Sequence, residues 1–147
     1  MVKVLKSTIL DAPIDAVWDV LRDFNGHDRW HPAVADSEIE RGRASDIVGC
    51  IRKFHLQDGS LLREQLMTLS DIDAAYSYCL LDTPVPLFNY VSHVRLFPVT
   101  DGDRTFWQWE GNFSTPAGEE NQLKNLVGAE IYEAGFEAIR SHMGVAA

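Results

Sequence analysis

The last quarter of the chain carries the hydrophobic pattern of one long helix. The stretch 119–143 contains no proline, and its apolar residues recur every three or four positions, as they do on one face of an α-helix. About 25 residues rising about 1.5 Å each give a helix of about 37 Å, which is long enough to cross a small sheet. The predicted apolar face consists of Leu123, Val127, Ile131, Ala134, Ala138 and Met143.

Two glycines, Gly128 and Gly135, lie close to this face. Glycine inside a helix is less favourable than alanine by about 1 kcal/mol, so each position calls for a reason. One reason is close packing of the helix backbone on its neighbour. The other is that something besides a protein side chain must fit beside the helix, and both interpretations stay open.

Before this helix, apolar and polar residues mostly alternate, which is the pattern of β-strands with one buried face. Turn sequences rich in Asp, Gly and Pro separate the runs at hairpin spacing, so an antiparallel sheet is expected. The predicted strands are residues 3–10, 34–40, 48–56, 60–70, 74–82, 89–99 and 104–113. Between the first two we expect a short helix beginning after Pro13, with Ile14, Val17, Trp18 and Leu21 as its apolar stripe, and a helical piece at 26–30.

These elements predict an α+β domain. A seven-stranded antiparallel sheet has one face to bury, and the long C-terminal helix and the two short helices are available to cover it. A curved sheet that wraps around one helix need not collapse onto it completely. Space left between them would form a ligand cavity.

The turn at Asp58-Gly59 allows two registers for its hairpin. A two-residue turn would place Lys53 opposite Glu64, whereas a three-residue turn with Gly59 in a left-handed conformation places Arg52 there. We prefer the second register because it gathers apolar residues on one face, namely Phe54, Leu56 and Leu62.

In that register Arg52 and Glu64 form a cross-strand pair on the concave side. One interpretation is a structural bridge, and the other is a polar anchor inside an apolar pocket. A buried ion pair alone is weak evidence for stabilisation, since desolvation can exceed the Coulombic gain. Burial should raise the pKa of Glu64, and Arg52 should oppose that change.

The alternation also predicts residues on the last three strands that face the cavity. For each of them, core packing or a position on the solvent-exposed face is the alternative. Glu110 would be a second inward carboxylate. The alternating sets are Tyr76, Tyr78 and Leu80, then Tyr90, Ser92 and Val94, then Phe106, Gln108 and Glu110 against Trp107 and Trp109.

Composition limits the class of protein. The chain has 147 residues, 46% hydrophobic and 24% charged, which is typical of one globular domain spanning 1–147. Its formal net charge is −9 at pH 7. Nucleic acids and anionic membranes attract basic proteins, so we expect neither as a partner.

Targeting and metal signals are weak. No apolar run reaches the ~20 residues of a membrane span, and the first residues lack a signal-peptide core. Cys50 and Cys79 lie in strand-like runs, so we expect reduced thiols and a cytoplasmic protein. His27 and His31 have the i, i+4 spacing of a zinc helix, but no Glu follows His27 and no third ligand is apparent. We therefore expect no metal and no cofactor.

Short motifs run through nearly the whole chain in a fixed order: residues 16–24, Trp30-His31-Pro32, 48–52, Asp58-Gly59, 63–66, Tyr76-Ser77-Tyr78, Pro84-Val85-Pro86, Asn89-Tyr90 and Trp109. In this order the chain resembles the SRPBCC superfamily, also called START-like or polyketide cyclase/dehydrase-like. It most resembles the small bacterial proteins named polyketide cyclases. The resemblance implies a helix-grip fold, in which the sheet wraps around the C-terminal helix and leaves a cavity.

The chain is also similar, more distantly, to the plant abscisic-acid receptors. Their gate loop is replaced here by the tight turn 57–60, and their pocket lysine has no counterpart near 32–36, so hormone sensing of that kind is not implied. The positions that match their pocket imply ligand contacts at Arg52, Phe54, Leu56, Glu64, Tyr78, Leu80, Tyr90, Ser92 and Glu110, and at Val127, Ile131 and Gly135 of the helix.

The first hypothesis is a binding module for a small lipophilic or aromatic molecule with at least one polar group. Leu62 would join the apolar residues named above in the cavity wall, and the 83–88 loop would lie at the cavity mouth. The alternative is a cyclase, dehydratase or isomerase with Glu64 or Glu110 as general acid or base. A third is an interaction protein with a filled cavity. We expect a monomer or a homodimer.

Overall fold

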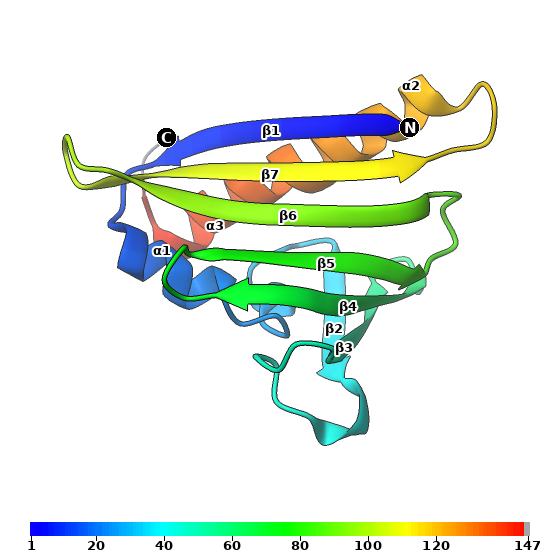
Figure 1. The fold of residues 1–147 in the computed structure, drawn as a ribbon, viewed down its shortest axis with the longest axis horizontal. Coiled ribbons are helices and arrows are strands. Elements are labelled where there is room, and N and C mark those ends of the chain that lie inside the picture. The colour runs from blue at the N-terminus through cyan, green and yellow to red at the C-terminus, as the bar shows by residue number, and fades with distance from the viewer. Residues whose placement is uncertain (146–147) are drawn as a thin grey trace.

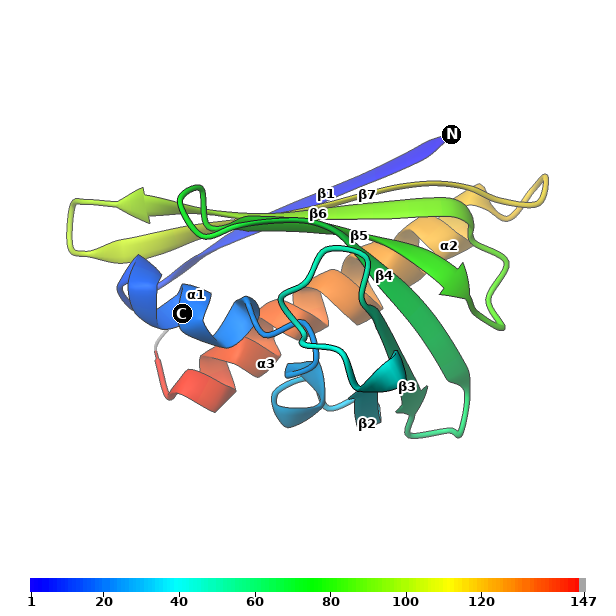
Figure 2. The ribbon, with the colours of Figure 1, turned by 60° about the horizontal axis from the view of Figure 1, so that its bottom comes forward.

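Seven strands form one curved antiparallel sheet that lies over the helices (Figures 1 and 2). The computed structural model describes residues 1–145. The order across the sheet is β1-β7-β6-β5-β4-β3-β2, which confirms the predicted architecture. The strands are β1 (Val2–Leu10), β2 (Val34–Ile39), β3 (Ile51–Leu56), β4 (Leu61–Ser70), β5 (Ala75–Asp82), β6 (Phe88–Val99) and β7 (Arg104–Ser114).

Two short helices connect β1 to β2 on the side of the sheet that faces the C-terminal helix (Figure 2). Helix α1 (Ile14–Leu21) begins after Pro13, as predicted, and buries Val17, Trp18 and Leu21. The short 3₁₀ helix η1 (His27–Arg29) follows it. A second 3₁₀ turn, η2 (Glu40–Gly42), links β2 to β3. The helices on the inner side of the sheet therefore come from the N-terminal and the C-terminal parts of the chain.

A continuous helical stretch from Glu120 to Met143 crosses beneath the sheet (Figure 2), which confirms the predicted C-terminal helix. It is regular at its two ends, α2 (Glu120–Asn125) and α3 (Ala134–Met143), but its middle is the π-helix η3 (Leu126–Glu133). A π-helix carries more residues in each turn than an α-helix, because its hydrogen bonds span five residues. The 3.6-residue period of the sequence analysis therefore fails across η3.

The π-helical segment shifts the buried face of the helix by one position. Val127 is fully buried, and the next residue to reach the core is Tyr132, five positions further on, rather than Ile131. Normal α-helical spacing then resumes with Phe136 and Ile139, which are also buried. The predicted apolar face was therefore right up to Val127 and wrong in its assignment of Ala134 and Ala138, which are only partly buried.

The β3–β4 hairpin adopts the three-residue turn that the sequence favoured. Gly59 has φ +88°, in the left-handed region that suits glycine. The amide of Leu56 donates to the carbonyl oxygen of Ser60 at 2.9 Å. Arg52 consequently lies opposite Glu64, and both side chains point to the concave face.

Stacked aromatic rings fix the helix against the sheet. Trp107 stacks on Trp109 with ring centroids 5.5 Å apart, and Trp109 stacks on Tyr132 of η3 at 4.3 Å. A Cβ on Gly135 would lie 2.8 Å from the Trp109 ring. Gly135 thus allows close packing on a tryptophan, and the interpretation that it leaves open space for a ligand is wrong.

Candidate ligand-binding cavity

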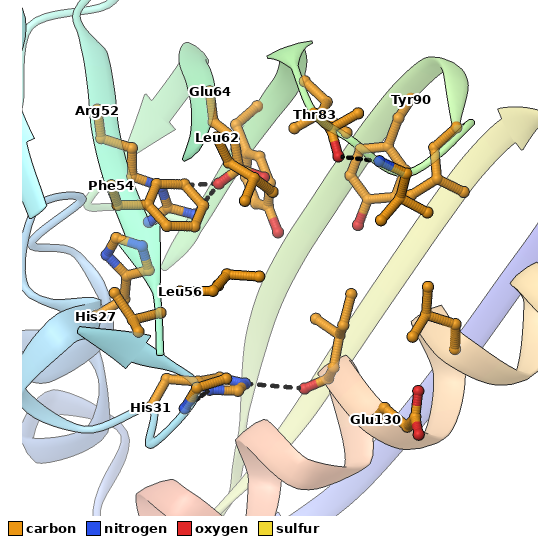
Figure 3. Close-up of a pocket in the computed structure, with 18 of the residues that line it drawn as sticks. His27, His31, Arg52, Phe54, Leu56, Leu62, Glu64, Thr83, Tyr90 and Glu130 are labelled. Atoms are coloured by element: carbon orange, nitrogen blue, oxygen red, sulfur yellow. Dashed lines mark hydrogen bonds and ion pairs between the residues drawn. The ribbon is translucent and has the colours of Figure 1, made fainter. Parts of the chain in front are cut away.

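A cavity of about 290 Å³ lies between the inner face of the sheet and η3 (Figure 3). Strands β3 to β5 form one wall, the segment from η1 to β2 forms the second, and η3 forms the third. The β5–β6 loop contributes Thr83, Val85 and Leu87 to the lining, as predicted for the 83–88 segment. The volume lies at the lower end of the range for small-molecule pockets.

Most of the residues expected at the site line this cavity together. They reach it from four strands and the helix, although they are scattered over 80 positions of the chain. Figure 3 shows several of them converging on the same space. The expected residues that line it are Arg52, Phe54, Leu56, Leu62, Glu64, Tyr78, Leu80, Tyr90 and Ile131.

An ion pair lies at the inner end of the cavity. Nε and Nη2 of Arg52 donate to Oε1 of Glu64 at 2.9 and 2.7 Å, and Nη1 donates to the carbonyl oxygen of Phe24 at 2.8 Å. The guanidinium carbon lies 4.0 Å from the Phe24 ring centroid and 5.0 Å from that of Tyr78. Arg52 is 5% exposed and Glu64 7%, so the pair is almost completely removed from water.

Burial and charge act in opposite directions on these two groups. Burial raises the pKa of Glu64, and the neighbouring Arg52 charge only partly offsets this. For Arg52 burial acts against the charged form, but the Glu64 carboxylate outweighs it and the pKa of Arg52 is raised. The sequence left the outcome for Glu64 open, and in the folded protein desolvation dominates.

Two buried histidines from the η1 segment border the cavity and were not predicted as site residues. His27 packs edge-on against Phe54 with ring centroids 4.6 Å apart, and neither of its nitrogens has a hydrogen-bond partner within residues 1–145. Burial first, and the Arg52 charge second, hold the pKa of His27 well below its usual 6.5. The ring is therefore neutral at physiological pH.

His31 joins the η1 segment to the π-helix. Its Nε2 lies 3.3 Å from the carbonyl oxygen of Ile131, and its Nδ1 accepts from the amide of Ala33 at 3.2 Å. These partners fit a neutral imidazole with the proton on Nε2. Burial lowers the pKa of His31 as well. The i, i+4 spacing of His27 and His31 was the signal available in the sequence, and it indicates that both lie on one buried face of a helical turn.

A network of hydroxyl groups extends from the cavity wall into the core. The Tyr90 and Tyr132 hydroxyls are 2.5 Å apart, Ser92 Oγ lies 3.1 Å from the Tyr132 hydroxyl, and Nε1 of Trp109 donates to Ser92 Oγ at 2.9 Å. Burial raises the pKa of both tyrosines, so their hydroxyls stay protonated. The network ties η3 to β6 and β7.

The structure places Glu110 on the opposite face of the sheet, so its interpretation as a second inward carboxylate is wrong. Glu110 pairs across the sheet with His93, the neighbour of inward Ser92, and its Oε1 lies 3.0 Å from Lys3 Nζ. The inner face of β7 is instead filled by Trp107 and Trp109, which are 0% and 4% exposed. Burying two tryptophans decides which face turns inward, and Glu110 cannot act as an acid or base in this cavity.

Three other expected residues lie behind the lining rather than in it. Ser92 is fully buried and bonded to Trp109 and the Glu110 carbonyl oxygen. Val127 is fully buried in the core, four residues after buried Leu123 on the same face of the helix. Gly135 lies under Trp109. Apart from the three residues of the expected 83–88 loop, the lining residues that the site prediction omitted are His27, Trp30, His31, Ala33, Val34, Tyr76, Trp109, Leu126 and Glu130.

Other kinds of site lack support in the part of the chain that the structure describes. No group of three or more His, Cys, Asp or Glu side chains is arranged to hold a metal ion among residues 1–145. Over the same residues, no helix combines the length and apolar character needed to cross a membrane.

A sheet that grips one long helix around a lined cavity is the helix-grip arrangement that the sequence resemblance implied. The sequence profile described as "Polyketide cyclase / dehydrase and lipid transport" matches residues 1–144. The chain therefore belongs to this family, which confirms its resemblance to the SRPBCC superfamily. No curated protein is significantly similar to the chain in sequence.

Solved bacterial structures share the fold over almost its full length. An uncharacterised protein from Bacillus thuringiensis is 26% identical with a TM-score of 0.83, covering 95% of this chain and 96% of its own. The protein XoxI from Bacillus cereus is 25% identical with a TM-score of 0.84, covering 96% and 94%. A protein from Thermobifida fusca has a TM-score of 0.87 at 24% identity, covering 98% and 94%, and shares the fold.

Proposed function

We propose that this protein binds a small lipophilic or aromatic molecule in the cavity between the sheet and η3. The observation that carries the proposal is an apolar cavity with a buried ion pair at its inner end. Leu56, Leu62 and Leu80 provide apolar walls. Membership of a family described by polyketide chemistry and lipid transport supports a hydrophobic ligand.

The size of the cavity limits the ligand. An engineered protein cavity of roughly 150 Å³ takes one benzene ring, so about 290 Å³ suits a molecule of about two rings. Val85 and Leu87 of the β5–β6 loop and Leu126 of η3 add apolar surface to the lining. A long acyl chain would need the walls to move apart, so a compact aromatic molecule fits better.

A pair of neighbouring leucines on β5 provides the test. Leu80 lines the cavity, whereas Leu81 is 41% exposed on the other face of the same strand. Leu80→Trp should fill the cavity, and Leu81→Trp should leave it open. Wild type, L80W and L81W are titrated calorimetrically with 2-naphthol, and native mass spectrometry of gently purified protein looks for a retained small molecule.

We expect wild type and L81W to bind 2-naphthol or retain a small molecule, and L80W to do neither. Circular dichroism checks that both tryptophan variants fold. Equal binding by L80W would place the ligand elsewhere on the protein. A wild-type protein that carries nothing, binds no naphthol and gains no thermal stability from lipids, flavonoids or aromatic polyketides would overturn the proposal in favour of a partner protein.

The second candidate is an enzyme of the cyclase or dehydratase type with Glu64 as general acid or base. The observation in its favour is that burial raises the pKa of Glu64, the direction that suits a group exchanging protons near neutral pH. Arg52 would stabilise a developing negative charge. An NMR titration of Glu64 with a bound aromatic ligand tests it, and a pKa at the usual value near 4.5 would count against the enzyme.

We also infer a cytoplasmic location and a monomer or homodimer. Cys50 and Cys79 are both free thiols, and Cys50 is buried, which suits a reducing compartment. Analytical ultracentrifugation distinguishes the two assembly states, and fractionation of cells that express the protein tests the compartment.

A further inference from the structure

The positive charge at the inner end of the cavity is already engaged. The guanidinium of Arg52 donates through all three of its nitrogens, twice to Glu64 and once to the Phe24 carbonyl oxygen. The rings of Phe24 and Tyr78 pack against it. An anionic ligand could pair with Arg52 only by displacing Glu64, which would leave a second negative charge in the same enclosed space.

Only one of the two carboxylate oxygens of Glu64 takes part in the ion pair. Both hydrogen bonds from Arg52 end on Oε1 of Glu64, and Oε2 accepts none from residues 1–145. Among those residues, the buried side-chain atoms that have no partner are both nitrogens of His27, Trp107 Nε1 and Arg140 Nε. Oε2 of Glu64 has no such partner and is not one of these buried atoms. It is therefore accessible from the cavity that Glu64 lines.

The rest of the lining adds no free positive charge. Glu130 lines the cavity from η3 and is exposed, so a second carboxylate lies on the side that solvent reaches. Tyr76 and Tyr78 line the inner part, and burial raises the pKa of both hydroxyls, which keeps them neutral. The formal net charge of −9 has the same sign as these two glutamates, and the only positive charge near a carboxylate ligand among the described lining residues is the engaged Arg52.

We propose that the cavity selects neutral ligands that donate a hydroxyl hydrogen bond to Oε2 of Glu64, and that it rejects carboxylates of the same shape. This inference rests on the proposed binding function and narrows it to phenol-like or other hydroxylated aromatic molecules of about two rings. The ion pair acts as a fixed acceptor: Arg52 holds Glu64 in position through two hydrogen bonds to Oε1, and the open oxygen faces the ligand.

Four naphthalenes of nearly equal size test the selection on the wild-type protein. 2-Naphthol donates a hydrogen bond, 2-methoxynaphthalene only accepts one, naphthalene does neither, and 2-naphthoate carries a negative charge at pH 7. A hydrogen bond to a charged acceptor corresponds to about tenfold or more in affinity. In calorimetric titrations 2-naphthol should bind at least tenfold more tightly than the ether and naphthalene, and 2-naphthoate should bind most weakly.

A change at Glu64 should reverse the preference. Glu64→Gln removes the negative charge while keeping the shape, which leaves Arg52 free to pair with a ligand carboxylate. E64Q should therefore bind 2-naphthoate more tightly than wild type does and lose its tenfold preference for naphthol over naphthalene. Glu110→Gln makes the same change on the outer face of the sheet, and it should keep the wild-type order.

The outcomes separate the two proposals. If none of the four compounds binds, the binding function itself fails. If naphthalene and 2-naphthoate bind as tightly as 2-naphthol, the cavity binds ligands but the neutral-donor selection is overturned. If E64Q does not fold, the order of the four affinities on wild type still decides the question.

Discussion

The two faces of the β3–β4 hairpin carry ion pairs of the same chemistry in opposite surroundings. Inside, Arg52 and Glu64 pair with side chains that are 7% and 9% exposed. Outside, Arg63, the residue next to Glu64, bonds to Glu40 at 2.6 and 2.9 Å and to Asp82 at 2.7 Å. Each arginine makes three hydrogen bonds, and the outer one has two carboxylate partners instead of one, but its side chain is 31% exposed.

Burial, rather than the number of contacts, separates the two groups. Water screens the outer cluster, and exposed pairs of this kind contribute little to folding. The inner pair has lost its water, so each charge depends on the other. The difference shows in the carboxyls, because the pKa of Glu40 is lowered by its bond to Arg63, whereas burial raises the pKa of Glu64.

Removing one charge on each face gives the largest expected contrast. Glu64→Gln strands the buried Arg52 charge and should lower the free energy of unfolding by about 3–5 kcal/mol, or the melting temperature by roughly 10 °C. Glu40→Gln leaves Arg63 with Asp82 and water, so its melting temperature should stay close to wild type. Thermal and urea unfolding of both variants measure this. Equal losses would mean that the outer cluster is also coupled to the core.

The hairpin also shows where sequence reasoning worked. The register of Arg52 and Glu64 was predictable because the Gly59 turn and the alternation of Phe54 and Leu62 agreed. Turn chemistry and side-chain alternation are local properties, so the strand order and most of the lining followed from them.

The errors came from features that local patterns do not encode. On β7 either face could turn inward by alternation alone, and the packing of Trp107 and Trp109 against the helix, a tertiary contact, placed Glu110 outside. The π-helical turn placed Tyr132 in the core where a regular helix would place Ile131. The i, i+4 spacing of His27 and His31 signals a shared buried face but not a place in the lining, because the cavity wall forms only in the folded protein.

The buried histidines predict a pH dependence that belongs to the inner face. His27 and His31 have pKa values lowered by burial. As pH falls below about 6.5, the unfolded chain binds protons there before the folded protein does, so the free energy of unfolding falls with pH. Each histidine that stays neutral when folded contributes a slope of up to about 1.4 kcal/mol per pH unit. Glu64 acts with the opposite sign between its raised pKa in the folded protein and the usual value of 4.5, because there the folded protein holds the extra proton.

The variant His27→Phe isolates one of these contributions. Between pH 6.5 and 5, the free energy of unfolding of this variant should change less with pH than that of wild type. The difference in slope should be up to about 1.4 kcal/mol per pH unit. At pH 7.5 it should be as stable as wild type or more so, because the two unpaired nitrogens are gone. Urea unfolding at pH 7.5, 6.5, 5.5 and 5.0 provides the data. An unchanged slope would show that His27 is protonated equally in both states.

Replacing both inner charges should have the smallest effect on stability. In the double variant Arg52→Met with Glu64→Leu, no stranded charge remains, and buried pairs replaced by apolar side chains are often neutral or stabilising. The Phe24 carbonyl oxygen loses its donor, which costs about 1 kcal/mol. The double variant should thus unfold within about 1 kcal/mol of wild type, far above E64Q.

The ligand preference of this double variant shows whether the inner pair serves ligand binding or the fold. It should bind naphthalene at least as well as wild type but lose the preference for 2-naphthol, because Oε2 of Glu64 is absent. Stability kept while selection is lost would mean that the inner pair serves the ligand rather than the fold. A double variant as unstable as E64Q would instead make the pair a structural bridge that the fold needs, unlike the outer cluster.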